Sequence, residues 1–172
     1  MKSIVSIFVA IGFLAALLPA QAQQQRSYPE GAAPQPTAVG DPLQRLYRVS
    51  GVLDNGGGPE GGQATSFHCT SASTVDETLR IRVRDFNGAI VGDQSIKITP
   101  NRTRTLSTHF TRMFFEDRTL SPGEVIAQGS AEILATSIQV FCSAMIVDAS
   151  TSSPQGIDLH LVRLNAIPGS QE

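Results

Sequence analysis

A row of arginines is the feature of this sequence with the clearest chemical potential. Arg80, Arg82 and Arg84 alternate with apolar residues, so they project from one face of an extended segment. Arg102 and Arg104 follow in a segment that could form a nearby strand. Guanidinium groups bind carboxylates, sulfates and phosphates through paired hydrogen bonds, so these five residues are the candidate ligand-binding site. Charged outer faces are common on antiparallel sheets. The opposing interpretation is therefore that the arginines pair with Asp and Glu across strands or form a solvated face.

Composition limits the partners of such a face. The chain has 172 residues, a net charge of −2, no tryptophan, 41% apolar and 16% charged residues. This is too apolar and too weakly charged for a disordered chain. Aromatic residues do not interleave with the arginines, so we expect no nucleic-acid partner. The expected partner is an unknown protein or glycan.

A second candidate site lies near the carboxyl end of the chain. Asp158 and His160 are two positions apart, so their side chains share one face of an extended segment. A carboxylate and an imidazole on one face could supply two metal ligands or part of a catalytic pair. The other interpretation is a polar outer face beside inward-pointing Leu159 and Leu161. One strand cannot complete a site, so a small secreted hydrolase or metal-dependent enzyme stands only as the alternative function.

The remaining motifs assign no catalytic residue and no cofactor. No two histidines have the spacing of metal ligands, and no G-x-S-x-G elbow occurs. We expect His68 to be exposed or hydrogen-bonded and His109 to cap a loop.

The glycine-rich segment 54–62 permits two interpretations. No helix follows it and no Lys-Ser or Lys-Thr pair closes it, which excludes a phosphate cradle. Asp54, Asn55 and Glu60 could offer oxygen ligands to calcium, although not in the order of an EF-hand. We expect a flexible loop that joins two strands.

The first 22 residues have the features of a signal peptide. Lys2 precedes an apolar run from Ile4 to Leu18. As a helix this run would rise about 22 Å, short of the roughly 30 Å of a bilayer core. Ala-Gln-Ala at 20–22 fits the pattern that a signal peptidase cleaves. We therefore predict cleavage after Ala22, export to the periplasm or outside the cell, and no membrane span afterwards; an uncleaved anchor is the alternative.

Residues 23–42 have the composition of a flexible Pro/Gln/Ala-rich arm. They contain four prolines and two glycines and show no apolar periodicity. Such a segment cannot bury enough surface to offset the entropy of ordering it. We therefore expect a single folded domain over residues 43–172.

Export would place Cys69 and Cys142 in a compartment where disulfides persist. Each cysteine lies within a predicted strand, and a bridge would close a loop of 73 positions. The chain-entropy model gives such a loop about 4.4 kcal/mol of stabilisation. The spacing is similar to that of the inter-sheet bridge of immunoglobulin-like sandwiches, although their buried tryptophan is absent. We predict the bridge; two reduced thiols or a metal site are the competing interpretations.

Apolar residues from Leu43 onward recur at every second position, which predicts strands. The predicted strand segments are 47–53, 64–70, 79–84, 89–91, 95–99, 103–108, 125–127, 131–135, 137–148 and 157–164. Asn87-Gly88 predicts a hairpin turn. Residues 109–118 could form one helical turn that caps the core. Together these segments predict an all-β domain of seven to nine strands, an antiparallel β-sandwich of immunoglobulin-like or jelly-roll-like type, with a small barrel as the alternative.

Several segments also resemble an uncharacterised family of small secreted bacterial β-sandwich proteins. The segments that carry this resemblance are SGVLDNGG, ATSFHCT, STHFTRMFFED, QGSAEILATS, FCSAMIVDA and GIDLHLVRLN. More loosely, the order of strands and turns looks like the sandwich of sensory-rhodopsin transducer proteins. The resemblance implies a sandwich with a sugar- or partner-binding role, and it assigns no catalytic residue to this chain. We therefore expect an exported, non-catalytic binding or structural domain whose ligand is a sugar, an envelope polymer or a protein.

Overall fold

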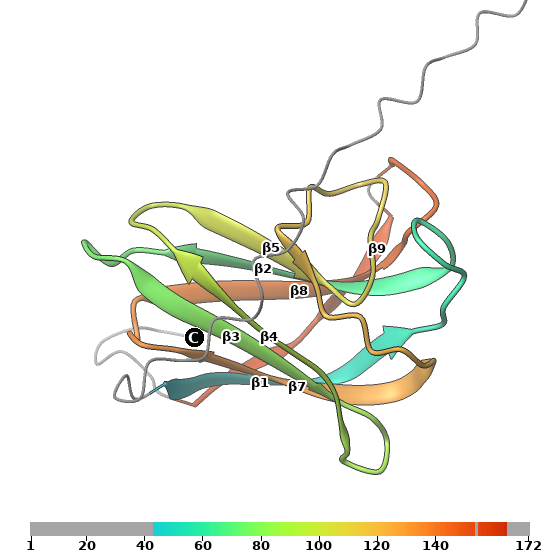
Figure 1. The fold of residues 1–172 in the computed structure, drawn as a ribbon, viewed down its shortest axis with the longest axis horizontal. Coiled ribbons are helices and arrows are strands. Elements are labelled where there is room, and N and C mark those ends of the chain that lie inside the picture. Colours follow the sequence, from blue (N-terminus) through green and yellow to red (C-terminus); the bar gives the residue numbers. More distant parts are fainter. Residues whose placement is uncertain (1–42, 154, 165–172) are drawn as a thin grey trace, which may run out of the picture. The chain divides into compact units, whose positions relative to one another are not determined.

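A computed structural model describes residues 43–153 and 155–164 of the chain. The predicted signal peptide, the predicted arm and residues 165–172 lie outside the described residues. The described part consists of ten β-strands and confirms the predicted all-β sandwich (Figure 1). It contains no helix, and hence none that is long and apolar enough to cross a membrane.

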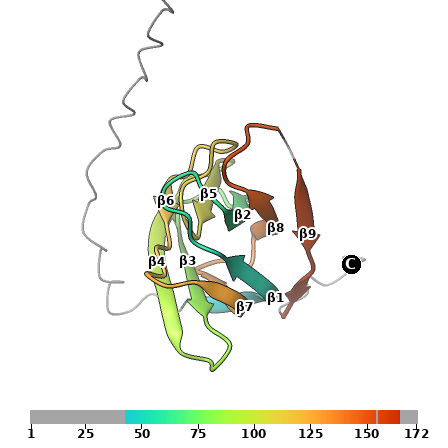
Figure 2. The same cartoon turned by 90° about the vertical axis from the view of Figure 1, so that its right-hand side faces the viewer.

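The ten strands form two five-stranded sheets, which appear as two facing layers in Figure 2. In spatial order, sheet A consists of β10 (Leu161–Arg163), β1 (Gln44–Asp54), β7 (Ile126–Ala135), β3 (Glu77–Arg84) and β4 (Ile90–Ile98). Sheet B consists of β6 (Arg118–Thr119), β5 (Thr103–Ser107), β2 (Gln63–Ser71), β8 (Val140–Asp148) and β9 (Gly156–Leu159). Every neighbouring pair is antiparallel except β5 and β6, which are parallel.

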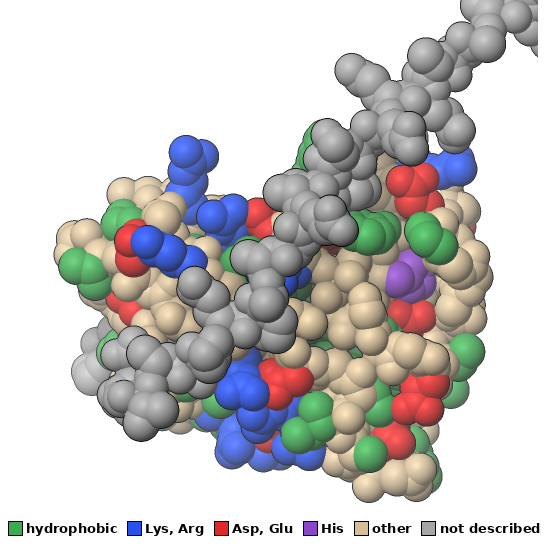
Figure 3. Space-filling model, viewed as in Figure 1, with side chains coloured by type: hydrophobic (Ala, Val, Ile, Leu, Met, Phe, Trp, Pro, Cys, Tyr) green, Lys and Arg blue, Asp and Glu red, His purple; other side chains and the backbone are tan. Residues whose placement is uncertain are grey.

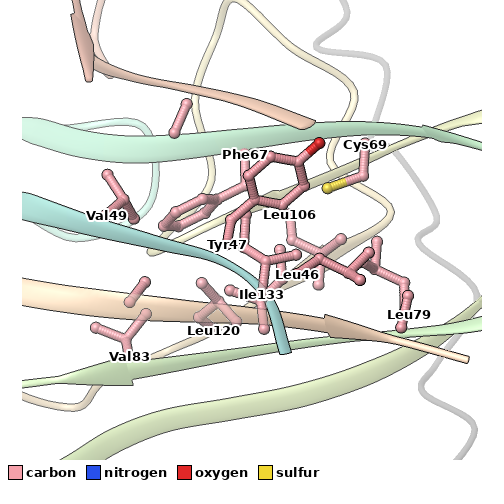
Figure 4. Close-up of a cluster of buried hydrophobic side chains, with 14 of the residues drawn as sticks. Leu46, Tyr47, Val49, Phe67, Cys69, Leu79, Val83, Leu106, Leu120 and Ile133 are labelled. Carbon is pink, nitrogen blue, oxygen red and sulfur yellow. The ribbon is translucent and has the colours of Figure 1, made fainter. Parts of the chain in front are cut away.

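The core lies between the inner faces of the two sheets. In β3, buried Leu79, Ile81 and Val83 alternate with half-buried arginines, as the period of two predicts. Figure 4 shows Leu79 and Val83 on the side of sheet A that faces Phe67 and Leu106 of sheet B, and Ile81 belongs to the same core cluster. Apolar side chains from both sheets are therefore removed from water together, which is the main favourable contribution to folding.

The strand boundaries differ from the predicted ones in several places. Segments 89–91 and 95–99 join into β4, and segments 125–127 and 131–135 join into β7. Segment 157–164 instead divides at His160 into β9 and β10, which belong to different sheets. The short strand β6 was not predicted at all. The structure has ten strands, more than the seven to nine expected.

Residues 108–117 form an irregular loop, so the expected helical turn at 109–118 is wrong. The loop nevertheless covers apolar surface, because Met113 and Phe114 pack against buried Ala64, Val147 and Ala149. Phe114 also meets the ring of His68 edge-on, with 4.4 Å between ring centroids. The segment therefore covers one part of sheet B without forming a helix.

Asn87-Gly88 lies in the predicted hairpin, between β3 and β4. The amide of Gly88 donates to the Asp85 carbonyl, and Gly88 has a φ of 87°. A turn closed by a left-handed glycine is typical of a three-residue hairpin loop. The Asn-Gly pair therefore predicted the hairpin correctly.

Cys69 and Cys142 form the predicted disulfide. They are directly opposite each other on β2 and β8, with Cα atoms 4.1 Å apart. Both strands belong to sheet B, so the likeness to an inter-sheet bridge is wrong: the bond joins neighbouring strands within one sheet.

One end of the sandwich gathers three loops, two of which carry the chain from one sheet to the other, and we call it the loop end. Segment 55–62 joins β1 to β2, the loop 108–117 joins β5 to β6, and segment 120–125 joins β6 to β7. The β3–β4 hairpin lies at the same end, on the right of Figure 1.

Candidate functional site

A pocket of about 500 Å³ opens among the loops at the loop end. Three chain segments form it, and the lining residues are Asp54, Gly56, Gly58, Pro59, Thr108, His109, Phe110, Thr119, Ser121, Pro122, Gly123, Glu124 and Val125. Its volume lies within the roughly 300–1,000 Å³ that is usual for small-molecule sites. Since the segments come from the ends of both sheets, the sandwich itself fixes their separation.

A buried ion pair forms part of the pocket wall. Asp54 ends β1 and is 3% exposed, and the His109 side chain is 15% exposed. Nδ1 of His109 lies 3.0 Å from Oδ2 of Asp54, and Nε2 lies 2.8 Å from the Gly61 carbonyl oxygen. A carboxylate and a carbonyl can only accept, so each imidazole nitrogen must carry a proton. The geometry therefore requires His109 to be an imidazolium.

The pKa values of the pair move in the directions that this arrangement requires. The Asp54 carboxylate raises the pKa of His109 above its ordinary value, against the opposing effect of burial. Burial would raise the pKa of Asp54, but hydrogen bonds from His109 and Gly56 outweigh it and hold that pKa below its ordinary value. Each shift therefore favours the charged form of its group.

The rest of the pocket combines apolar surface with hydroxyl and carboxylate groups. Phe110 and Val125 contribute apolar surface, and Thr119, Ser121 and Glu124 contribute polar atoms. The hydroxyls of Thr119 and Ser121 are 2.7 Å apart. Because both nitrogens of His109 are already occupied by acceptors, the imidazole cannot take a proton from a nucleophile in this arrangement. The lining offers hydrogen-bond donors, acceptors and apolar surface to a ligand.

The candidate calcium ligands of segment 54–62 have separate partners. Oδ1 of Asp54 accepts from the Gly56 amide, Oδ1 of Asn55 accepts from the Gln63 amide, and Oε2 of Glu60 pairs with Arg112. Within residues 43–153 and 155–164, no group of three or more His, Cys, Asp or Glu residues could hold a metal ion. These oxygens therefore serve to shape the loop.

The loop 108–117 is anchored by a second buried polar group, Glu116. Its Oε1 accepts from the backbone amide of Thr111 at 3.0 Å and from the Thr111 hydroxyl at 2.6 Å. Beside Glu116, the hydroxyls of Ser66 on β2 and Ser107 on β5 are 2.7 Å apart in sheet B.

His68 on β2 contacts Thr105 through Nδ1, and burial lowers the pKa of His68. His68 is hydrogen-bonded and half-buried, and His109 joins two loops.

Arg80, Arg82 and Arg84 project from the outer face of sheet A, as predicted, and each has a partner. Arg80 donates to both carboxylate oxygens of Asp93, at 2.6 Å each, and Nε of Arg82 donates to Asp93 at 3.2 Å. Arg84 donates to the Gly88 carbonyl. Cross-strand pairing, the opposing interpretation of this row, is therefore present.

Two further arginines that the sequence did not single out extend this row. Glu132 on β7 is buried, and its carboxylate lies 3.0 Å from Arg48, 3.4 Å from Arg45 and 3.6 Å from Arg82. Arg48, Glu132, Arg82 and Asp93 are successive register partners across β1, β7, β3 and β4. The row therefore crosses four strands.

Arg102 and Arg104 do not join this row. Arg104 lies on β5 of sheet B, where it pairs with Asp117 at 2.5 Å and reaches the Lys97 carbonyl. Arg102 lies in the preceding turn and is exposed. The expected five-arginine site is therefore divided between two sheets.

Asp158 and His160 are both exposed, and neither lines the pocket. Among the described residues, neither side chain has a hydrogen-bond or ion-pair partner. His160 is the single residue between β9 and β10, where the chain changes sheet. The expected catalytic pair therefore lies at the surface, outside the pocket.

Sequence reasoning missed the pocket, because Asp54 and His109 are 55 positions apart and belong to no local motif. The only available signals were a carboxylate at the end of a predicted strand and a histidine in an apolar segment. Comparisons of the chain with protein-family models, curated proteins and solved structures found no match, and function is therefore inferred from this geometry.

Proposed function

We propose that this chain is an exported, non-catalytic binding protein whose loop-end pocket holds a sugar unit. The observation that carries the proposal is the pocket built around the Asp54–His109 ion pair. Charged groups buried in the protein are costly unless they are paired, so the pair fixes the wall before any ligand arrives. A preformed wall lowers the ordering cost of binding.

A sugar fits the mixture of groups that line this pocket. Sugar rings present hydroxyls at their edges and C–H groups on their faces. Thr119, Ser121 and Glu124 offer donors and acceptors to the hydroxyls, and Phe110 and Val125 offer apolar surface to the ring. The same composition suits a sugar at the end of an envelope polymer.

Export is part of the proposal, and the disulfide supports it. Disulfides persist in oxidising compartments and are rare where glutathione keeps thiols reduced. Cys69 and Cys142 are bonded, which fits a periplasmic or extracellular location. The signal peptide expected at residues 1–22 would direct this export.

The test is a glycan array with the purified chain, followed by titration of the best sugar. Replacing Val125 by Arg places a long charged side chain in the pocket and should weaken binding about tenfold or more. Val75→Arg is the matched control, because Val75 is also 62% exposed and lies between β2 and β3, away from the loop end. No sugar binding at millimolar concentration, or equal loss in both variants, would refute the proposal.

A further inference from the structure

We propose that the outer face of sheet A is a second binding surface, for an acidic polysaccharide, and that it acts independently of the pocket. The surface consists of Arg45, Arg48, Arg80 and Arg82 arranged around the carboxylates of Asp93 and Glu132. We call this group the arginine platform. Two features suit it to bind an anion: its Glu132 carboxylate is more buried than the arginines around it, and its cations outnumber its carboxylates.

The carboxylates of the platform lie deeper than the cations. The Glu132 side chain is 5% exposed, whereas those of Arg48 and Arg45 are 56% and 44% exposed. The Glu132 carboxylate therefore holds the guanidinium groups from the side of the sheet, while their outer sides face water. Arginines held in this way lose little further side-chain freedom when they bind an anion.

The face carries more positive charge than its own carboxylates neutralise. Six cations project from it or from its rim: Arg45, Arg48, Arg80, Arg82, Arg84 and Lys97. Three carboxylates pair with them, those of Asp76, Asp93 and Glu132. Asp85, in the hairpin beside Arg84, is a fourth carboxylate at the rim, which leaves an excess of two positive charges on a chain of net charge −2. Figure 3 shows Lys and Arg side chains gathered around Asp and Glu along the lower side of the view, over this sheet.

Donor groups remain after the internal pairs have formed. The pairing of Arg48 with Glu132 uses Nη2, which leaves Nε and Nη1 without a described partner. Arg80 uses Nε and Nη2 on Asp93, which leaves Nη1. Each guanidinium has five N–H groups, so the platform can hold its own carboxylates and accept carboxylate or sulfate groups from a ligand.

The shape of the platform favours a polymer over a small anion. Its arginines lie on β1 and β3, which are separated by β7, so their backbones are about 10 Å apart. Between them the carboxylate of Glu132 already contacts arginines of both strands. A ligand chain with repeated acidic groups can contact more of the outward-facing guanidinium groups at once than a single small anion can. No aromatic side chain of the described residues projects among these arginines, so the base stacking that single-stranded nucleic acid needs is not offered.

The experiment is a titration of the purified chain with polygalacturonate and with dextran sulfate, using neutral dextran as the ligand control. We expect both acidic polymers to bind, neutral dextran not to bind, and affinity to fall as salt rises. The double variant Arg45→Gln/Arg48→Gln should lose about tenfold or more in affinity, while Glu132 keeps its contact with Arg82.

The matched control is Arg102→Gln/Arg112→Gln, which removes the same charge from exposed positions outside the platform. Equal loss in both double variants, or no binding to either acidic polymer, would overturn the proposal. So would stronger binding to duplex DNA or to anionic lipid vesicles than to the acidic polymers. Val125→Arg should leave this binding unchanged, so failure of the pocket and failure of the platform are distinguishable.

Discussion

Nδ1 of His109 lies 3.0 Å from Oδ2 of Asp54, although the two residues are 55 positions apart in the chain. The pair joins the loop 108–117 to the end of β1, and the second imidazole nitrogen of His109 holds the Gly61 carbonyl. One protonated side chain therefore connects the three segments that surround it. Loss of the proton on Nδ1 or on Nε2 would leave that ring nitrogen, now an acceptor, facing the oxygen of Asp54 or of Gly61 in a largely buried position.

The first prediction concerns the pH dependence of stability. The pKa of His109 is raised above its ordinary 6.5 in the folded chain. The folded chain therefore holds this proton more tightly than the unfolded chain does. Its stabilising contribution is complete below pH 6.5 and is lost as pH rises through the folded-state value. We expect the free energy of unfolding, measured by urea titration, to fall as pH rises above 6.5.

His68 produces the opposite slope on the acid side. Burial lowers its pKa, so the unfolded chain binds this proton more readily and stability falls as pH decreases below 6.5. Stability should therefore be greatest near pH 6.5. His109→Gln should abolish the alkaline fall, whereas His160→Gln, at an exposed position, should keep it. A pKa below 6.5 for His109 in an NMR titration would contradict this account.

Sequence pattern predicted the strands whose two faces differ in polarity. The alternation of Leu79, Ile81 and Val83 with arginines placed β3 and its buried side correctly. The change of sheet at His160 had no such signal, because the apolar alternation continues on both sides of it. Gly92, Asp93 and Gln94 were left outside the predicted strands, yet β3 pairs with this segment and Arg80 binds Asp93. Tertiary contacts decided those boundaries.

The candidate sites were less predictable than the strands. The disulfide was predicted from two cysteines in a chain expected to be exported, but its position within one sheet depends on strand order, which local pattern does not determine. Arg80 and Arg82 were found from spacing alone. Arg48 and Glu132 were missed, because their pairing depends on β1 and β7 being neighbours across 84 positions.

The second prediction concerns the disulfide. The Cys69–Cys142 bond joins β2 to β8, two interior strands of sheet B, across 73 positions. Reduction should lower the free energy of unfolding by about 4 kcal/mol, because the unfolded chain regains the freedom that the closed loop removes. Urea titration with and without a reductant measures this. If mass spectrometry confirmed full reduction and the urea midpoints were still equal, the disulfide would contribute nothing to the free energy of unfolding.

The third prediction concerns the buried carboxylate of the arginine platform. Glu132→Gln leaves Arg45, Arg48 and Arg82 close together without their shared anion. We expect a loss of about 1–3 kcal/mol in the free energy of unfolding, since a buried charged partner is removed. High salt should restore part of this loss, because the arginines are partly exposed and their repulsion is screened. Glu124→Gln, at an exposed position, serves as the control and should change stability little.

The fourth prediction concerns Gly129, where β7 passes a register shift opposite Val52. A Cβ atom at this position would lie 2.6 Å from the Arg84 carbonyl oxygen and 2.6 Å from Cγ2 of Ile126. Backbone cannot move aside as a flexible side chain can, so β7 must shift relative to β3. We expect Gly129→Ala to lower the free energy of unfolding by about 1–3 kcal/mol, as overpacking does. Ser130→Ala at the next position adds no atom and should have little effect. If thermal melting showed equal stability for Gly129→Ala and the unmodified chain, the close approach of β7 to β3 at this point would be wrong.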